Sequence, residues 1–298
     1  MLKDLSSGGL PHPLTAAFVT PSFPLDLARC ELLVESRERL ASDFTHYLLI
    51  DEPHIPVFKH LESDTTKIVP SRDLLGQYLR RIPGSSGYWI GLFTPPVRGW
   101  MTQQLRKLAI CNHISEDIVI CIDSDTAFVR PFRIDDVIEE EKIGLLDVPY
   151  RDASTDKWTR VSETLLGLPK DSVPVRNHVA HLVPWVRNHV IDMLHHVEKT
   201  QNKPWQIVLA RQLTFSEYTL YGAYIRGRLG YENSMHVPSS LPLVRQPWSH
   251  DFGSSESMRA YICFPEPGNV AVMIHSKFGI SADDLRPHFR EIWNSNSS

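Results

Sequence analysis

Residues 117–122, DIVICI, constrain the fold more than any other part of the chain. Five apolar residues follow one another here, with no alternation between apolar and polar positions. A strand with this pattern is buried on both faces, as strands are in the middle of a parallel sheet that is flanked by helices. We therefore expect an α/β fold whose mostly parallel central sheet is covered by helices.

Strand and helix patterns alternate on both sides of this stretch, and loop-rich insertions separate some of them. We expect strands at 14–20, 46–53, 117–122, 142–150 and 269–279. We expect helices at 25–41, 100–112, 181–200, 215–230 and 281–293, and a long, mostly irregular excursion at 54–99. Pro184 should fall in the first turn of its helix, and Ser216 or Thr214 should cap the helix at 215–230.

The helix at 100–112 should carry two distinct faces. Met101, Leu105 and Leu108 form an apolar face, and Trp100 lies with Gln104 and Lys107 on another. No internal repeat, linker or change of composition divides the chain, so we expect one domain over residues 1–298, with a disordered tail at 294–298.

Composition restricts the partners and the location. The formal net charge of −4 provides no excess of cations for a nucleic-acid backbone, so nucleic acid is not expected as a partner. The four cysteines lack CxxC spacing, which fits a reducing cytoplasm. The N-terminus has no signal-peptide pattern and no window approaches 18 apolar residues, so we expect a soluble, cytoplasmic protein. A peripheral contact with the inner face of a membrane is left open.

Two carboxylates follow the buried stretch, Asp123 and Asp125. Alternate residues of an extended chain point the same way, about 6 to 7 Å apart, so the two side chains can face one site. Ligands bind at the carboxyl ends of strands in open α/β sheets. An Mg²⁺ or Mn²⁺ ion that bridges a diphosphate would offset the repulsion between the two carboxylates. The alternative is an Asx-turn, in which these side chains only hold loop amides.

The stretch VRGWMTQQLRKLAICNHISEDIVICIDSDTAFVRPF resembles the core of a GT-A fold glycosyltransferase, with a helix, a central strand and a DxD metal motif in that order. VTPSF, DLARCELL, DSDTAFVRPF and FSEYTLYGAYI are similar to a bacterial group of uncharacterised glycosyltransferase-like proteins. The resemblance implies a GT-A-like α/β domain. About residues 14–150 would bind the nucleotide sugar and metal, and about residues 151–290 would bind the acceptor.

The resemblance also implies a donor site that uses Mn²⁺ or Mg²⁺ and a nucleoside-diphosphate sugar, with a UDP-sugar favoured. The metal ligands would be Asp123, Asp125 and His275. The residues placed at the nucleotide sugar are Thr20, Pro21, Ser22, Asp51, Arg98, Gln104, Lys107, Ser124 and Lys277. The alternatives are a simple turn at residues 20–22, a solvated face on the helix at 100–112 and local hydrogen bonding by His275.

Glu217 lies at the start of the helix at 215–230, where inverting GT-A enzymes often hold an acidic residue. The resemblance makes Glu217 the general base that takes the acceptor's proton. Its alternative role is electrostatic, because carboxylates are favoured in the first turn of any helix. The pair His178 and His181 suggests zinc, but no cysteine partner or HExxH motif accompanies it, which disfavours a zinc site.

Together with the resemblance, these residues favour a metal-dependent glycosyltransferase, and the resemblance implies a glycan or glycolipid acceptor in bacterial surface polysaccharide synthesis. One rival is a phosphatase of the haloacid dehalogenase type, which also uses a strand followed by DxD. That group usually carries the motif on its first strand and a Thr or Val where this chain has Ala127. The other rival is a non-catalytic carbohydrate-binding protein on a transferase fold.

Overall fold

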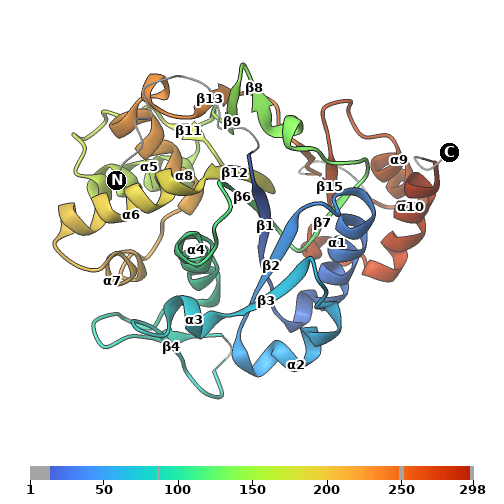
Figure 1. The fold of residues 1–298 in the computed structure, drawn as a ribbon, viewed down its shortest axis with the longest axis horizontal. Coiled ribbons are helices and arrows are strands. Elements are labelled where there is room, and N and C mark those ends of the chain that lie inside the picture. Colours follow the sequence, from blue (N-terminus) through green and yellow to red (C-terminus); the bar gives the residue numbers. More distant parts are fainter. Residues whose placement is uncertain (1–13, 86, 248–251, 296–298) are drawn as a thin grey trace.

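The computed structural model describes residues 14–85, 87–247 and 252–295. A five-stranded sheet in the order β12-β6-β1-β2-β3 forms its centre (Figure 1). Its strands are β1 (Ala16–Pro21), β2 (Thr45–Ile50), β3 (Thr66–Pro70), β6 (Ile118–Ile122) and β12 (Leu182–Val186). Four of them run parallel, and β12 is antiparallel to β6. The expected α/β class with a mostly parallel sheet is confirmed.

The apolar run that predicted the central strand is β6, and all five of its residues are buried. Its side chains alternate between two clusters of the core, as strand geometry requires. Val119 and Cys121 pack into the cluster that contains α4, α6 and α8 residues, and Ile120 packs into the one that contains Phe18 and Leu33. Burial on both faces therefore explains why the run lacks polar positions.

Helices cover both faces of the sheet (Figure 1). On one side lie α4 (Gly99–Ala109), α5 (Ala153–Leu166), α6 (Arg187–Gln201), α7 (Trp205–Ala210) and α8 (Glu217–Tyr224). On the other lie α1 (Leu27–Leu40), α2 (Ile55–Phe58), α9 (Ser255–Cys263) and α10 (Ala282–Ser295). The expected helices over α1, α4, α8 and α10 are confirmed, and Ser216 caps α8 by accepting a hydrogen bond from the Thr219 amide.

Small sheets and a hairpin complete the fold. The strand β7 (Thr126–Phe128) pairs with β15 (Ala271–Met273), which pairs with β14 (Val244–Arg245). The second small sheet contains β8 (Ile138–Glu139), β9 (Lys142–Leu146) and β13 (His236–Ser239). β10 (Val148–Pro149) pairs with β11 (Arg176–Asn177), and β4 (Arg80–Arg81) pairs with β5 (Trp89–Ile90) near α3 (Ser71–Leu75).

The expectation of one helix over 181–200 was wrong. Residues 182–186 form β12, and the helix α6 begins only at Arg187. Pro184 therefore lies in a strand instead of a first helical turn, opposite Ile120 of β6. β12 is the edge of the sheet, where a proline without an N–H is tolerated. Local pattern failed here because an apolar segment followed by a helix resembles the first turn of that helix.

The excursion at 54–99 is more regular than expected. It contains β3, which pairs with β2 and forms the other edge of the central sheet, as well as α2, α3 and the β4–β5 hairpin. The strand expected at 142–150 divides into β9 and β10, which lie outside the central sheet. The tail expected at 294–298 is helical up to Ser295, and residues 296–298 lie outside the described residues, as do residues 1–13.

All four cysteines, Cys30, Cys111, Cys121 and Cys263, are free thiols. Among the helices formed by the described residues, none combines the length and the apolar character that a membrane crossing needs.

A buried histidine between β9 and α8 should make stability depend on pH. His236 bonds the Ile143 carbonyl at 3.0 Å and the Tyr221 hydroxyl at 2.6 Å. Burial, with His189 and Lys142 nearby, lowers its pKa to about 3, so the folded protein keeps the ring neutral while the unfolded chain protonates it below about pH 6.5. The contribution of the neutral His236 ring to the free energy of unfolding is therefore fully present above pH 6.5. It decreases as the pH falls from 6.5 towards 3, by up to about 1.4 kcal/mol per pH unit. We expect the free energy of unfolding, measured by urea unfolding at several pH values, to depend less steeply on pH in His236→Gln. An unchanged dependence on pH would contradict this assignment.

Candidate functional site

The carboxyl ends of β1, β2 and β6 meet at one edge of the central sheet, because these strands are parallel neighbours. Residues 20–22 end β1, Asp51 follows β2 and Asp123 follows β6. Thr20 is fully buried; its hydroxyl donates to the Ile122 carbonyl at 2.8 Å and lies 2.9 Å from His46 Nε2. Pro21 and Ser22 are also buried. The fold thus gathers the predicted nucleotide and metal residues of three strands, and in the structure the Thr20 side chain links those strands.

Asp123 and Asp125 lie where the chain passes from the central sheet to the small sheet. The Thr126 amide donates to the Asp123 carbonyl at 3.2 Å, which closes a turn, and β7 follows. The Asp123 carboxylate contacts Lys107 Nζ at 3.0 Å and His181 Nδ1 at 2.9 Å. Burial acts to raise the pKa of Asp123, but Lys107 and His181 outweigh it and hold that pKa well below its usual range. The carboxylate is therefore ionised and bonded to other side chains, not to loop amides.

The Asp125 carboxylate differs from that of Asp123. Its Oδ1 is buried and has no hydrogen-bond partner. Burial and the neighbouring Asp123 charge raise its pKa to about 6, although His181 and Arg29 act in the opposite direction. A buried carboxylate oxygen without a partner is costly unless something positive binds it. Asp125 Oδ1 thus has the character expected of a cation ligand.

Backbone pairing brings His275 alongside the two aspartates. The Ile274 amide donates to the Asp125 carbonyl at 3.1 Å, which continues the β7–β15 pairing by one step. His275 Nδ1 accepts a hydrogen bond from the Lys277 amide at 3.0 Å, so in the neutral ring Nε2 carries the proton. In this structure the His275 ring therefore makes a local hydrogen bond, which was the alternative to metal binding. No three His, Cys, Asp or Glu side chains within residues 14–85, 87–247 and 252–295 surround one point as metal ligands do.

The loop that carries His275 is fixed by Arg29, which was not predicted as a site residue. Arg29 is buried in α1 and donates to the Ile274 carbonyl at 2.6 Å and the Ile280 carbonyl at 2.5 Å. These two carbonyls lie on either side of His275 and Lys277. The exposed Lys277 places its Nζ 5.6 Å from the Phe278 ring centre. No local pattern marks Arg29, because both carbonyls lie about 250 residues away.

Lys107 connects the aspartate pair to Glu217. Besides Asp123, its Nζ lies 3.3 Å from Glu217 Oε1 and 2.8 Å from the Tyr218 hydroxyl. The side chain is buried, which acts to lower the pKa of Lys107, but Asp123, Tyr218 and Glu217 raise that pKa well above its usual value. A permanently charged ammonium therefore lies between the predicted metal-binding carboxylate and the predicted base.

Gln104 lies one helical turn before Lys107 and reaches the same neighbour. Its Oε1 accepts a hydrogen bond from the Glu217 amide at 3.0 Å. Gln104 and Lys107 are both buried, whereas Trp100 is exposed. The polar face of α4 is therefore exposed at Trp100, whereas Gln104 and Lys107 are buried and contact α8.

Glu217 is the first residue of α8, and its side chain is buried. Burial raises the pKa of Glu217, while Lys107 and the amide at the helix start lower it. A carboxylate with a raised pKa can exchange a proton nearer neutral pH than an ordinary one. Glu217 and Asp123 come from elements almost a hundred residues apart, and Lys107 contacts both.

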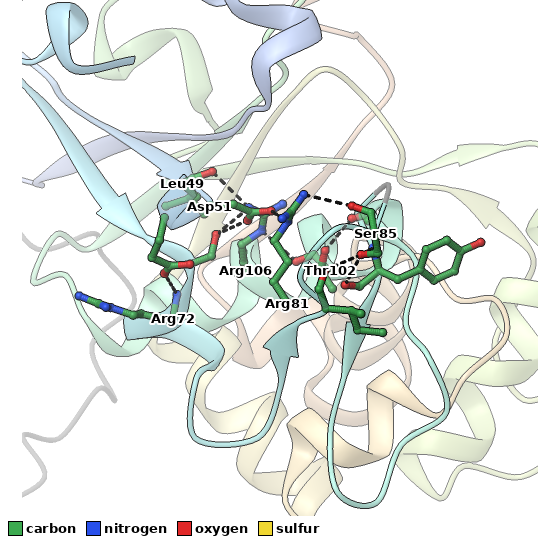
Figure 2. A network of polar contacts seen from close by, with 12 residues as sticks. Leu49, Asp51, Arg72, Arg81, Ser85, Thr102 and Arg106 are labelled. Atoms are coloured by element: carbon green, nitrogen blue, oxygen red, sulfur yellow. Dashed lines mark hydrogen bonds and ion pairs between the residues drawn. The ribbon is translucent and has the colours of Figure 1, made fainter. Parts of the chain in front are cut away.

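Asp51 is engaged in a network at the end of β2, which Figure 2 shows. Its Oδ1 accepts hydrogen bonds from Arg106 at 2.8 Å and from the Ser71 hydroxyl at 2.7 Å. Arg81 lies 3.5 Å from Oδ2 and also donates to the Ser85 carbonyl at 3.3 Å (Figure 2). The Asp51 carboxylate therefore ties α3, α4 and the β4–β5 hairpin to the sheet.

The other predicted residues are dispersed. Arg98 is exposed at the N-cap of α4. Ser124 is buried and bonds the Asp26 side chain, whose pKa is raised by burial. His178 bonds the Leu146 carbonyl at 2.7 Å, whereas His181 contacts Asp123, so the two histidines have different partners. His181 was not predicted as a partner of Asp123, because its only sequence signal is a histidine directly before β12.

The model of the Family of unknown function (DUF6492) matches residues 19–251, more than half of the chain. This chain belongs to that family. The DUF6492 match includes Asp123, Asp125 and Glu217 and ends before His275 and Lys277. A comparison of the sequence with curated proteins gives no significant match.

Solved structures similar to this DUF6492 member include three glycosyltransferases. Mouse xyloside xylosyltransferase 1, in its apo form, is 13% identical, with 90% of this chain and 99% of that chain covered and a TM-score of 0.45. The galactosyltransferase LgtC, in complex with donor and acceptor sugar analogues, is 12% identical, with 95% and 96% covered and a TM-score of 0.45. The glycosyltransferase GlyE of Streptococcus pneumoniae is 12% identical, with 95% and 62% covered and a TM-score of 0.42. These values are too low to transfer an activity to this chain.

Proposed function

We propose that this protein is a GT-A-like glycosyltransferase that moves a sugar from a nucleoside-diphosphate donor to a glycan or glycolipid acceptor. One observation carries the proposal: Asp123 and Asp125 end the central strand, and Lys107 links Asp123 to the buried Glu217. A site that transfers a sugar needs a place for a cation and a diphosphate beside a base for the acceptor. This cluster would supply the side chains for both, and Lys107 joins Asp123 to Glu217 by hydrogen bonds.

The donor set fits a divalent ion in its chemistry. Asp125 Oδ1 is buried without a partner, and each Asp123 oxygen retains a second lone pair beside its bond to Lys107 or His181. Mg²⁺ is usually held by one or two carboxylates together with substrate phosphates. Asp123 and Asp125 would hold Mg²⁺ or Mn²⁺, and His275 would be the third ligand once its ring exchanges the Lys277 amide for the ion. When bound, the ion supplies Lewis-acid stabilisation of the departing diphosphate.

The remaining donor contacts are proposed from the strand ends and α4. Thr20, Pro21, Ser22 and Asp51 would surround the nucleotide, and residues 14–150 would form the half of the domain that binds it. Residues 151–290 would form the acceptor half. Arg98, Gln104, Ser124 and Lys277 complete the proposed set. We place the activity in bacterial surface polysaccharide synthesis in the cytoplasm, at the inner face of the membrane, with a UDP-sugar as the favoured donor.

Glu217 is the proposed general base. The acceptor hydroxyl oxygen forms a bond to the anomeric carbon, the bond from that carbon to the diphosphate oxygen breaks, and the hydroxyl proton passes to Glu217. Its raised pKa and its position at the start of α8 support this role. Direct attack by the acceptor inverts the anomeric configuration, so we favour inversion.

Turnover of nucleotide sugars tests the proposal. UDP-, GDP-, CMP- and dTDP-sugars are incubated with the full-length protein in the presence and absence of Mn²⁺, and the released nucleotide is measured. We expect one donor to be turned over only with the metal, and the same donor to raise the melting temperature. Turnover of p-nitrophenyl phosphate instead would favour a phosphatase, and donor binding without any turnover would favour a carbohydrate-binding protein.

The variant Glu217→Gln separates the base from a helix-start carboxylate. If Glu217 takes the proton, kcat should fall by about 10²–10⁴-fold while the KM for the donor changes little. Gln keeps the size of the side chain and one oxygen for Lys107. Equal losses in kcat and donor affinity would assign Glu217 to structure alone.

A further inference from the structure

Residues 88–100 expose several large apolar side chains to solvent. Leu92 is 88% exposed and Phe93 62% exposed. Tyr88, Ile90 and Trp100 are exposed as well. Single exposed apolar residues are ordinary, but five in one short segment indicate a contact surface. We call the side chains of Tyr88, Ile90, Leu92, Phe93 and Trp100 the apolar tip.

The backbone under the apolar tip is fixed. Trp89 and Val97 are buried and exchange two backbone hydrogen bonds, of 2.8 and 2.7 Å, which close the neck of the turn. Beyond the neck, the Gly91 amide donates to Thr94 Oγ1 at 2.9 Å, and the Thr94 amide donates to the Gly91 carbonyl at 3.3 Å. Leu92 and Phe93 thus occupy the two central positions of a tight turn.

Gly91 shows that this turn packs against the body of the protein. A Cβ atom at Gly91 would lie 2.3 Å from the Tyr78 carbonyl oxygen, so only glycine fits there. Figure 1 shows the chain around β4 projecting from the body near α3. The fold therefore uses a buried tryptophan, a paired neck and an obligatory glycine to hold Leu92 and Phe93 outward.

The charge around the apolar tip identifies its partner. The chain has a net charge of −4, yet residues 74–115 contain no Asp or Glu and five Arg or Lys residues. Of these, Arg80 and Arg98 are exposed beside the tip in sequence, while Arg81, Arg106 and Lys107 are engaged within the protein. A segment that exposes cations and contains no acidic residue is complementary to an anionic surface. A nucleic-acid backbone would match these cations but would not bury the exposed apolar side chains of Leu92 and Phe93.

We infer that the apolar tip docks on an anionic phospholipid bilayer, with Leu92 and Phe93 inserted at the boundary of the headgroups. Aromatic residues such as Tyr88 and Trp100 are favoured at the headgroup level. Arg80 would contact lipid phosphates and contribute attraction to the negative surface. The insertion is interfacial and involves no membrane-spanning segment.

The docking geometry connects the membrane to the proposed site. Trp100 lies in the first turn of α4, and Lys107 lies seven residues later on the same helix. At 1.5 Å per residue, Lys107 is about 10 Å along the helix axis from the membrane-facing end. A sugar on a lipid headgroup would thus be presented to the cluster of Asp123 and Glu217. This part of the inference rests on the proposed function, whereas the docking itself does not.

Vesicle sedimentation tests the docking with the full-length protein and no donor. Vesicles of phosphatidylcholine mixed with phosphatidylglycerol should bind the protein, and pure phosphatidylcholine vesicles should bind it more weakly. The double variant Leu92→Ser/Phe93→Ser should lose at least about tenfold in partitioning, because two apolar side chains no longer leave water. Arg80→Glu should lose about fivefold, on the mixed vesicles only.

Leu213→Ser is the matched control, because Leu213 is 93% exposed and lies away from the tip in sequence. It should partition as the unchanged protein does, and thermal unfolding should be the same for all these variants. Equal binding by Leu92→Ser/Phe93→Ser and the unchanged protein would overturn the inference, as would binding of duplex DNA in place of vesicles. Vesicle binding without nucleotide-sugar turnover would support the docking and refute the proposed function. Nucleotide-sugar turnover without vesicle binding would support the proposed function and refute the docking.

Discussion

Replacing Lys107 with methionine is expected to lower the free energy of unfolding by about 3–5 kcal/mol, the usual loss when one partner of a buried ion pair is removed. The ammonium of Lys107 lies 3.0 Å from Asp123 and 3.3 Å from Glu217. The Glu217 side chain is 6% exposed and the Lys107 side chain 7% exposed, so water cannot replace the lost charge at Glu217. Methionine keeps the apolar length of the chain and removes only the charge.

Urea unfolding at neutral pH measures this loss, and a second substitution identifies its cause. Lys107→Met combined with Glu217→Gln should be less destabilised than the sum of the two single variants, because the buried carboxylate is then gone. Lys157→Met, on the exposed face of α5, is the matched control and should change stability by no more than about 0.5 kcal/mol. A loss for Lys107→Met no larger than that of the control would show that the bridge contributes little.

Asp125→Asn should reduce metal-dependent turnover of the donor by about 10²–10³-fold or more, as expected when an essential electrostatic group at the reacting centre is removed. The fold should survive the change. Asp125 Oδ1 has no hydrogen-bond partner to lose, and the substitution removes one of two neighbouring negative charges. We therefore expect the loss of activity to occur without a loss of stability.

The measurement is nucleotide release over a titration of Mn²⁺, with thermal unfolding in parallel. Asp135→Asn is the control, because Asp135 is an exposed carboxylate shortly after the same motif. It should leave both readouts unchanged. Retention of most of the activity by Asp125→Asn at ordinary Mn²⁺ concentrations would refute the role of the aspartate pair.

Much of the architecture could be predicted because it depends on local pattern. The run that became β6 is apolar at every position, and this pattern fits only a strand covered on both faces. The helix α4 was predicted from the spacing of Met101, Leu105 and Leu108, all of which are buried. The two edge strands of the sheet, β3 and β12, were not predicted, because they are defined by their pairing with a neighbouring strand and not by a local pattern. β3 is short, lies inside a polar segment and becomes a strand only by pairing with β2.

The candidate site divides in the same way. The aspartate pair was located by its position after an apolar strand, and Glu217 by its position at a helix start. The contacts of these residues were not predicted. Arg29 and His181 carry no motif. Lys107 was expected either to contact a diphosphate or to lie on a solvated face of its helix.

The sequence by itself determined the central strand β6 and the helices α1, α4, α8 and α10, and it placed two carboxylates directly after that buried strand, since all of these follow from which residues leave water. Only the tertiary structure decided that Lys107 joins Asp123 to Glu217, because its partners are 16 and 110 residues away in the chain. An ion pair between distant residues leaves no periodic trace in a sequence. It forms because packing α4 and α8 on the same face of the sheet brings opposite charges together where water is excluded.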